Sequence, residues 1–281
     1  MIELAPNHKF GLPIATPVLP AAGAFGYGDA YRDLIDYRCL GALVTHPVSL
    51  HPRRAAHPPR VVVRGEHLLI HTGHPNPGLS AILRQFRDLW DRLGLPVILH
   101  VLAGTPAEMA EVMDKLSGEA AIQGIELGLD EHTSVEKALA LLRSIRLNSD
   151  LPVIVRVPFS GVSALSQPLA EAGADALTLT SPPRGLLPLS EASDDASPPL
   201  MHGRLYGPAV FPLLLQQLSY WIPRLPVPVI ACGGITSPAD ARTCLALGAV
   251  AVQLDAVVWR RPDLLATIAK ELAYDSGNTT S

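Results

Sequence analysis

Short apolar runs alternate with longer amphipathic segments along this chain. The runs are continuously apolar, as expected for strands of a parallel sheet that is covered on both faces. They are Pro17–Pro20, Ala42–Thr45, Val97–Val101, Gly124–Leu127, Val153–Val157, Ala176–Thr180, Val229–Cys232 and Ala251–Leu254. Helical spacing is visible in Leu79–Leu93, Pro106–Leu116, Val135–Leu147, Val210–Ile222 and Pro238–Leu247. Eight such units predict a (β/α)8 TIM barrel, with a doubly wound open sheet as the alternative.

Two segments exceed what a minimal barrel needs. Pro52–Thr72 follows the second strand and contains two short strand-like runs, and Pro182–Arg204 follows the sixth strand and is rich in Pro and Ser. Loops that follow barrel strands lie at the C-terminal face, so both insertions are predicted to cover the site there. For residues 190–199 a plain surface loop is the alternative. We expect one domain over residues 1–281, with 275–281 as a flexible tail.

Composition excludes several classes of protein. Basic residues number 22 and acidic residues 26, and no basic block occurs, which argues against nucleic-acid binding. The three cysteines lack disulfide or zinc spacing. No run approaches the ~20 apolar residues of a membrane span, and the start lacks a signal-peptide layout, so we expect a cytoplasmic protein that does not bind membranes. None of the four lysines ends a strand, which excludes Schiff-base aldolase chemistry.

Several motifs occur in an order that points to one known family. They are PVLPAAGAFGYGDAY at Pro17–Tyr31, the second strand and Pro-Arg turn at Leu40–Val61, Asn76-Pro77-Gly78, Gly207-Pro208-Ala209, and IACGG at Ile230–Gly234. From about Pro13 to Leu265 the chain resembles the dihydroorotate dehydrogenase family, in particular its class 1 branch. The resemblance implies an FMN-binding TIM barrel of pyrimidine metabolism that oxidises a dihydropyrimidine.

That reaction requires a base that removes one proton while the flavin takes a hydride, and a cradle for the FMN phosphate. Mapped onto this sequence, the resemblance assigns substrate contacts to Asn76 and Ser181, and the base to Glu131 or His132. It assigns FMN contacts to Gly23, His46, His100, Arg156, Gly207, Gly233 and Gly234. These assignments predict an oxidoreductase acting on a small molecule.

The chain departs from the family pattern at its polar positions. His46 replaces the lysine after the second strand, His100 replaces a flavin-contacting asparagine, and Gly128 replaces another asparagine. Asp255-Ala256 replaces a Gly-Thr pair beside the phosphate, where a carboxylate repels the phosphate dianion. Two interpretations follow. One is an FMN oxidoreductase with an eroded redox site, and the other is a non-catalytic pseudoenzyme with a partner-binding or regulatory role.

A metal-dependent barrel is a third alternative. His46, His100, Glu126, Asp130 and His132 lie in or after neighbouring strands, and such ligands can hold zinc or manganese. A single histidine at a strand end more often packs in the interior and makes a hydrogen bond than binds a metal, so no metal is predicted. The resemblance also leaves open a homodimer and an iron–sulfur electron-transfer subunit, for which no residue of this chain argues.

Overall fold

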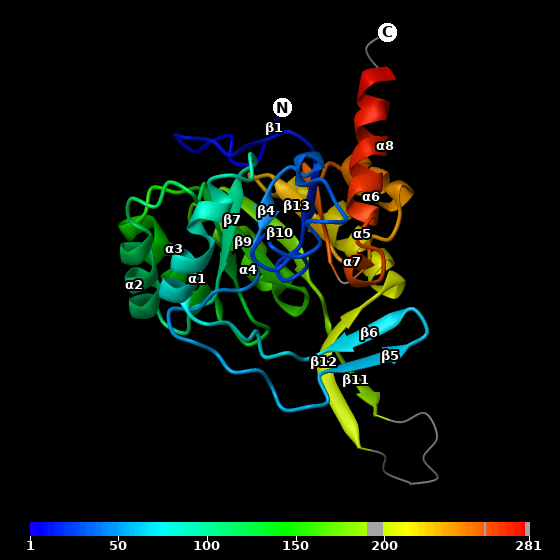
Figure 1. The fold of residues 1–281 in the computed structure, drawn as a ribbon, viewed down its shortest axis with the longest axis horizontal. Coiled ribbons are helices and arrows are strands. Elements are labelled where there is room, and N and C mark those ends of the chain that lie inside the picture. Colours follow the sequence, from blue (N-terminus) through cyan, green and yellow to red (C-terminus); the bar gives the residue numbers. More distant parts are fainter. Residues whose placement is uncertain (190–198, 256, 279–281) are drawn as a thin grey trace.

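The computed structural model describes residues 1–189, 199–255 and 257–278 (Figure 1). Its parallel strands are β3 (Val18–Pro20), β4 (Leu43–Val44), β7 (Val97–Val101), β8 (Gly124–Gly128), β9 (Val153–Pro158), β10 (Ala176–Ser181), β13 (Val229–Cys232) and β14 (Ala251–Leu254). They pair in the order β3-β14-β13-β10-β9-β8-β7-β4. At the remaining seam Gly41 N donates to Val18 O at 2.9 Å. The TIM-barrel prediction is therefore confirmed, and the open sheet is wrong.

Helices surround the strands (Figure 1). They are α1 (Leu79–Trp90), α2 (Pro106–Leu116), α3 (Val135–Asn148), α4 (Val162–Glu171), α5 (Phe211–Trp221), α6 (Pro238–Ala246), α7 (Val257–Arg260) and α8 (Leu264–Asn278), with 3-10 turns at Tyr37–Cys39, Phe159–Gly161, Pro208–Val210 and Ile222–Arg224. Thr105, Ser134 and Ser237 cap α2, α3 and α6 by accepting backbone N–H bonds. Among the described residues, no helix has the length and apolarity required to cross a membrane.

Helix α8 extends beyond its predicted end. It continues to Asn278, inside the segment 275–281 that was predicted as a tail. No proline interrupts this stretch, and elongation of an existing helix fixes only one residue for each hydrogen bond gained. Residues 279–281 lie outside the described part of the chain.

The barrel interior changes from apolar to polar along its axis. At the N-terminal end, β1 (Ile2–Glu3) and β2 (Pro13–Ile14) close the bottom, and their apolar side chains pack against the inward residues of the strands. These inward residues include Ile98, Ile154 and Ile230, all fully buried. Side chains two positions further along a strand point to the same side. In the corresponding strands those positions are His100, Arg156 and Cys232, so the polar layer lies at the C-terminal mouth.

The two insertions pair with each other in one sheet. β5 (Val61–Arg64), β6 (His67–Ile70), β11 (Arg184–Pro188) and β12 (Leu200–Tyr206) pair in the order β11-β12-β6-β5. Val62, Leu69 and Met201 form a small buried cluster on one face of this sheet. The sheet projects from the side of the barrel away from the chain termini (Figure 1). Of the predicted surface loop at 190–199, residues 190–198 are not among those the structure describes.

Candidate functional site

Six inward side chains form a buried polar layer at the mouth of the barrel. They are His100, Glu126, Arg156, Thr178, Cys232 and Gln253, each from a different strand. None is more than 6% exposed. Polar side chains at such depth are stable only when they are hydrogen-bonded to one another.

Glu126 is the centre of this layer. Its Oε2 accepts the Nδ1–H of His100 at 2.6 Å, and its Oε1 accepts bonds from Thr178 Oγ1 at 2.9 Å and Gln253 Nε2 at 2.7 Å. Burial raises the pKa of Glu126, but the hydrogen bond and charge of His100 and the charge of Arg156 outweigh it and hold this pKa at about 2. The group is thus a carboxylate at neutral pH. Because a carboxylate only accepts, His100 carries its proton on Nδ1.

Arg156 connects the strands on the other side of the mouth by hydrogen bonds. Its Nη1 donates to Gln253 Oε1 at 3.3 Å and its Nη2 donates to Cys232 Sγ at 3.1 Å. Burial raises the pKa of the Cys232 thiol to about 12, so this thiol stays neutral and unreactive. The guanidinium is therefore a fixed part of the wall.

Gly128 is required by the position of His100. A Cβ added at Gly128 would overlap the Nε2 and Cε1 atoms of His100. The asparagine that the resemblance places at this position is therefore incompatible with the imidazole where it lies. The two replacements, histidine at 100 and glycine at 128, act as one change.

Three hollows lie around this layer. The mouth cavity, with His100, Arg156 and Ser181 in its wall, has a volume of about 50 Å³. An outer cavity of about 160 Å³ adjoins it and is lined by Arg53 and Lys137 among others. A glycine-rich cleft of about 370 Å³ lies between the loops after β13 and β14 and is lined by Gly207, Gly234, Thr236, Asp255 and Arg260 among others. Tyr206 borders both the mouth cavity and this cleft.

Two further histidines near the mouth are held neutral. His46 Nε2 lies 3.1 Å from the carbonyl oxygen of Pro75, and burial lowers the pKa of His46. Burial, together with the charges of His100, Arg204 and Arg53, lowers the pKa of His74 to about 3. Neither imidazole supplies the positive charge that a lysine at position 46 would carry.

The candidate bases lie away from the mouth cavity. Glu131 Oε1 lies 2.6 Å from Arg204 Nη1, and Arg184 Nε donates to Glu131 Oε2 at 3.0 Å. Glu131 thus connects the loop after β8 to the β11–β12 hairpin. His132 is exposed, and its backbone N–H donates to Asp130.

Of the two predicted substrate contacts, only Ser181 lines the mouth cavity. The amide of Asn76 is occupied by its own turn and by the loop after β4. It donates to Ser49 Oγ at 3.0 Å and His74 O at 3.1 Å, and it accepts from Gly78 N at 3.0 Å. Asn76 therefore shapes the chain next to the mouth, and the mouth cavity holds one of the two predicted residues.

The predicted glycines hold special backbone positions. Gly233 and Gly234 have φ values of 134° and 67°, and a Cβ at Gly234 would overlap the backbone nitrogen of Phe211. At Gly207, with φ 132°, a Cβ would lie 2.6 Å from His67 Nδ1. Gly23, with φ 91°, faces His46 at an ordinary contact distance. The tight turns around the cleft therefore need glycine whether or not a ligand binds.

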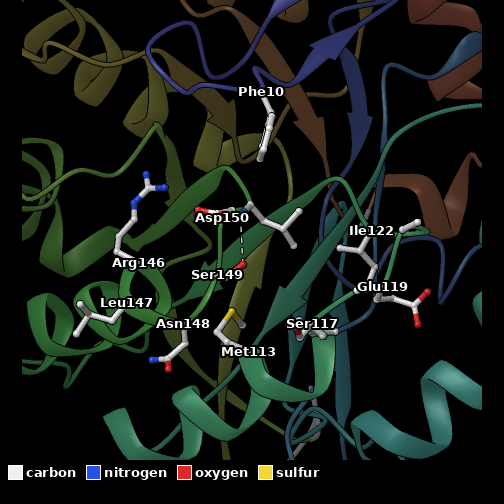
Figure 2. Close-up of a pocket in the computed structure, with 14 residues that line it drawn as sticks. Phe10, Met113, Ser117, Glu119, Ile122, Arg146, Leu147, Asn148, Ser149 and Asp150 are labelled. Atoms are coloured by element: carbon white, nitrogen blue, oxygen red, sulfur yellow. Dashed lines mark hydrogen bonds between the residues drawn. The ribbon is translucent and has the colours of Figure 1, made fainter.

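A separate hollow of about 580 Å³ lies at the opposite pole, before β8 and β9 (Figure 2). Its charged groups are already paired. Arg146 donates to Asp175 at 2.5 Å, and Asp150 pairs with Lys9 at 2.8 Å. Figure 2 shows Phe10 and Leu147 at different sides of this hollow, with no convergent set of polar groups. It therefore has no features of a reaction site.

The described residues contain no group of three or more His, Cys, Asp or Glu side chains arranged to hold a metal ion. Of the three histidines of the metal hypothesis, His46 lies 3.1 Å from Pro75 O, His100 binds Glu126, and His132 is exposed. The geometry gives that hypothesis no support.

The sequence is similar to those of known proteins over almost its whole length. The catalytic subunit of dihydroorotate dehydrogenase B (NAD(+)) from Citrifermentans bemidjiense is 30% identical over 276 residues, which cover 93% of this chain and 90% of the relative. The chain belongs to the dihydroorotate dehydrogenase family. The family profile matches residues 6–130. Dihydroorotate dehydrogenase A (fumarate) from Lacticaseibacillus paracasei is 29% identical over 283 residues, covering 94% of this chain and 95% of that relative. The resemblance is thus confirmed, and it relates the chain to oxidoreductases.

The mouth does not fit the FMN that this family implies. Ligand pockets commonly measure about 300–1,000 Å³, and the glycine-rich cleft of about 370 Å³ lies in this range. The mouth cavity, where the flavin ring would lie against the strand ends, measures only about 50 Å³. The cleft at the phosphate end is larger, but the buried carboxylate of Asp255 lines it. The residues present therefore fit the flavin ring poorly.

Three residues of this region were not predicted from the sequence. Tyr206 lines the mouth cavity, and Thr178 and Gln253 belong to the polar layer around Glu126. Thr178 and Gln253 lie at inward positions, two residues after Ala176 and Ala251. A polar residue at an inward position of an otherwise apolar strand indicates a polar layer inside the barrel, and this pattern could have located both residues. Tyr206 directly precedes Gly207, and a large side chain next to a predicted cofactor contact could have indicated that it borders the cavity.

Proposed function

We propose that this chain is a dihydroorotate dehydrogenase family protein with an eroded redox site, which binds a small molecule without using FMN. The small, walled mouth cavity is the observation that carries this proposal. The wall consists of buried side chains that hold one another, so opening it would break several hydrogen bonds. In relation to the family reaction, the chain is a pseudoenzyme.

The positions expected to do chemistry support this proposal. Glu131, the candidate base, is paired with two arginines, and His46 is neutral where an ammonium would stabilise a reduced flavin. Without a flavin the protein has no electrons to pass on. We therefore expect it to act without an electron-transfer subunit, unlike a relative whose name specifies NAD(+) as its oxidant. A ligand-binding or regulatory role remains for the barrel.

An FMN-dependent oxidation of a dihydropyrimidine is the second candidate. The glycine-rich cleft favours it, because positive-φ glycines and Arg260 there resemble a phosphate cradle. In this alternative Glu131 or His132 is the base. The two candidates differ in whether the flavin ring is bound.

Reconstitution with FMN tests the proposal. We expect the purified chain, incubated with excess FMN and desalted, to show no flavin absorbance and to leave dihydroorotate unoxidised in the presence of a redox dye. A curated family member treated in parallel controls for the procedure. Stoichiometric flavin in the desalted chain would overturn the proposal. In that case the rate of flavin reduction in Glu131→Gln and in His132→Asn would identify the base.

A further inference from the structure

Strand β5 is an edge of the insertion sheet, the sheet formed by β5, β6, β11 and β12. The order β11-β12-β6-β5 leaves β5 with one neighbour, and its residues Val61–Arg64 pair with β6. The β5–β6 hairpin projects from the barrel (Figure 1). An edge strand presents a row of backbone N–H and C=O groups that can pair with a further strand.

The register of the hairpin decides which backbone groups of β5 face outward. His71 N donates to Arg60 O at 2.8 Å, so the backbone of Arg60 points toward the chain of β6. In an antiparallel pair, successive residues direct their N–H and C=O groups alternately to the two sides of the strand. Val62 therefore bonds to β6, whereas Val61 and Val63 direct their backbone groups to the open edge.

The outward backbone groups are largely unused. Within the described part of the chain, the N–H and C=O of Val61 and the N–H of Val63 have no hydrogen-bond partner. The C=O of Val63 accepts from Nη1 of Arg64 at 3.0 Å. The side chains of Val61 and Val63 share one face of the strand and are 50% and 54% exposed. An open backbone edge beside exposed apolar side chains is the arrangement to which extended peptides bind by strand addition.

The segment that leads into β5 is positively charged. Residues 51–64 contain four arginines and no acidic residue, and Glu66 lies in the turn at the far end of β5. Arg54 and Arg60 are exposed, and among the described residues neither forms an ion pair. Nε of Arg60 donates to the carbonyl oxygen of Ala56 at 2.6 Å, which leaves its charge unneutralised. Two such charges beside an open strand edge favour an acidic partner.

Pairing of β5 with β5 of a second copy is disfavoured. The antiparallel register that uses the outward groups of both copies sets Val61 opposite Val63, and it therefore sets Arg60 opposite Arg64. Each such contact brings two pairs of arginines together, and like charges directly opposite each other destabilise a strand pair. The edge therefore discriminates against itself and in favour of a strand of opposite charge.

We propose that the open edge of β5 binds an extended acidic segment of another protein, which adds a strand to the insertion sheet. Backbone groups of this segment pair with Val61 and Val63, and its apolar side chains cover the two valines. Its carboxylates lie at Arg54 and Arg60. None of these four residues lines the mouth cavity or the outer cavity, so the inference does not depend on whether the barrel holds a flavin.

Fluorescence anisotropy of the full chain with a labelled peptide of about nine residues tests this site. The acidic probe alternates glutamate and valine, and the basic probe has lysine in place of each glutamate. We expect the acidic probe to bind and the basic probe not to bind. Val63→Pro removes one outward N–H and leaves the bonds between β5 and β6 in place, so it should weaken binding by about tenfold. Val63→Thr keeps that N–H and should bind nearly as well as the parent chain.

The charge contribution has its own pair of variants. Arg54→Gln combined with Arg60→Gln should weaken binding of the acidic probe by about fivefold and make it less sensitive to salt. Arg84→Gln combined with Arg92→Gln, at exposed positions in and directly after α1, is the matched control. Its affinity for the probe should equal that of the parent chain.

Amide hydrogen exchange of the parent chain gives a readout that needs no variant. The acidic probe should slow exchange at Val61 and Val63 and leave Val62 unchanged, because the N–H of Val62 already bonds to β6. No binding of the acidic probe, equal binding of the basic probe, or unchanged affinity in Val63→Pro would overturn the site. Tighter binding of a single-stranded oligonucleotide, or self-association that Val63→Pro abolishes, would assign the edge to a different partner and overturn it as well.

Discussion

Replacing Glu126 by Leu should destabilise the protein by about 3–5 kcal/mol, because it removes the one buried anion to which His100, Thr178 and Gln253 donate. The change also removes a buried negative charge that acts on Arg156. Leucine has a similar volume, so the cost comes from unpaired polar groups and not from a cavity. Urea unfolding at pH 7 measures it as a lower midpoint.

Two further variants make this result specific. Glu126→Gln keeps one acceptor oxygen in the same place, so it should lose clearly less stability than Glu126→Leu and remain foldable. Glu111→Ala, at an exposed position of α2, should change stability by no more than about 0.5 kcal/mol. If Glu126→Leu were as stable as the parent chain, the hydrogen-bonded layer would not hold the mouth closed, and the mouth could open for a flavin ring.

Most of the barrel could be predicted because its strands are buried on both faces. Continuous apolar runs such as Val97–Val101 and Val229–Cys232 have the same bounds in the structure as in the sequence pattern. Proline behind a Thr or Ser cap located the starts of α2 and α6. The sheet built from β5, β6, β11 and β12 could not be predicted, because pairing between insertions about 130 residues apart depends on where the barrel places their ends.

The site was harder to predict than the fold. A resemblance compares residues one position at a time, so it treats His100 and Gly128 as two independent replacements of asparagine. The structure shows that they are linked, because the imidazole of His100 occupies the space that Gly128 leaves open. Asn76 matches a substrate motif in sequence, but its amide is bound to Ser49 in the loop after β4 and to Gly78 in its own turn. The sequence names the groups near the mouth, and only the coordinates show which of them already have partners.

Acid should destabilise the protein in part through His74. Burial and the nearby charges of His100, Arg204, Arg53 and His46 lower the pKa of His74 from an ordinary 6.5 to about 3. Between these two values the unfolded chain binds a proton at this residue and the folded chain does not. The unfolded state is therefore favoured as the pH falls below 6.5, by up to about 1.4 kcal/mol for each pH unit.

His74→Asn isolates this contribution. His74 has φ 53°, a left-handed conformation that asparagine tolerates better than most residues, so the variant should keep the local backbone. We expect the free energy of unfolding of the parent chain to fall more steeply between pH 6.5 and 4.5 than that of His74→Asn. The carboxylates are present in both chains, so their contribution cancels in the difference between the two curves. His132→Asn, at an exposed histidine, should follow the parent curve. Parallel curves for all three proteins would show that His74 takes up its proton equally in the folded and unfolded states. Water would then reach His74 in the folded protein, and burial would not lower its pKa.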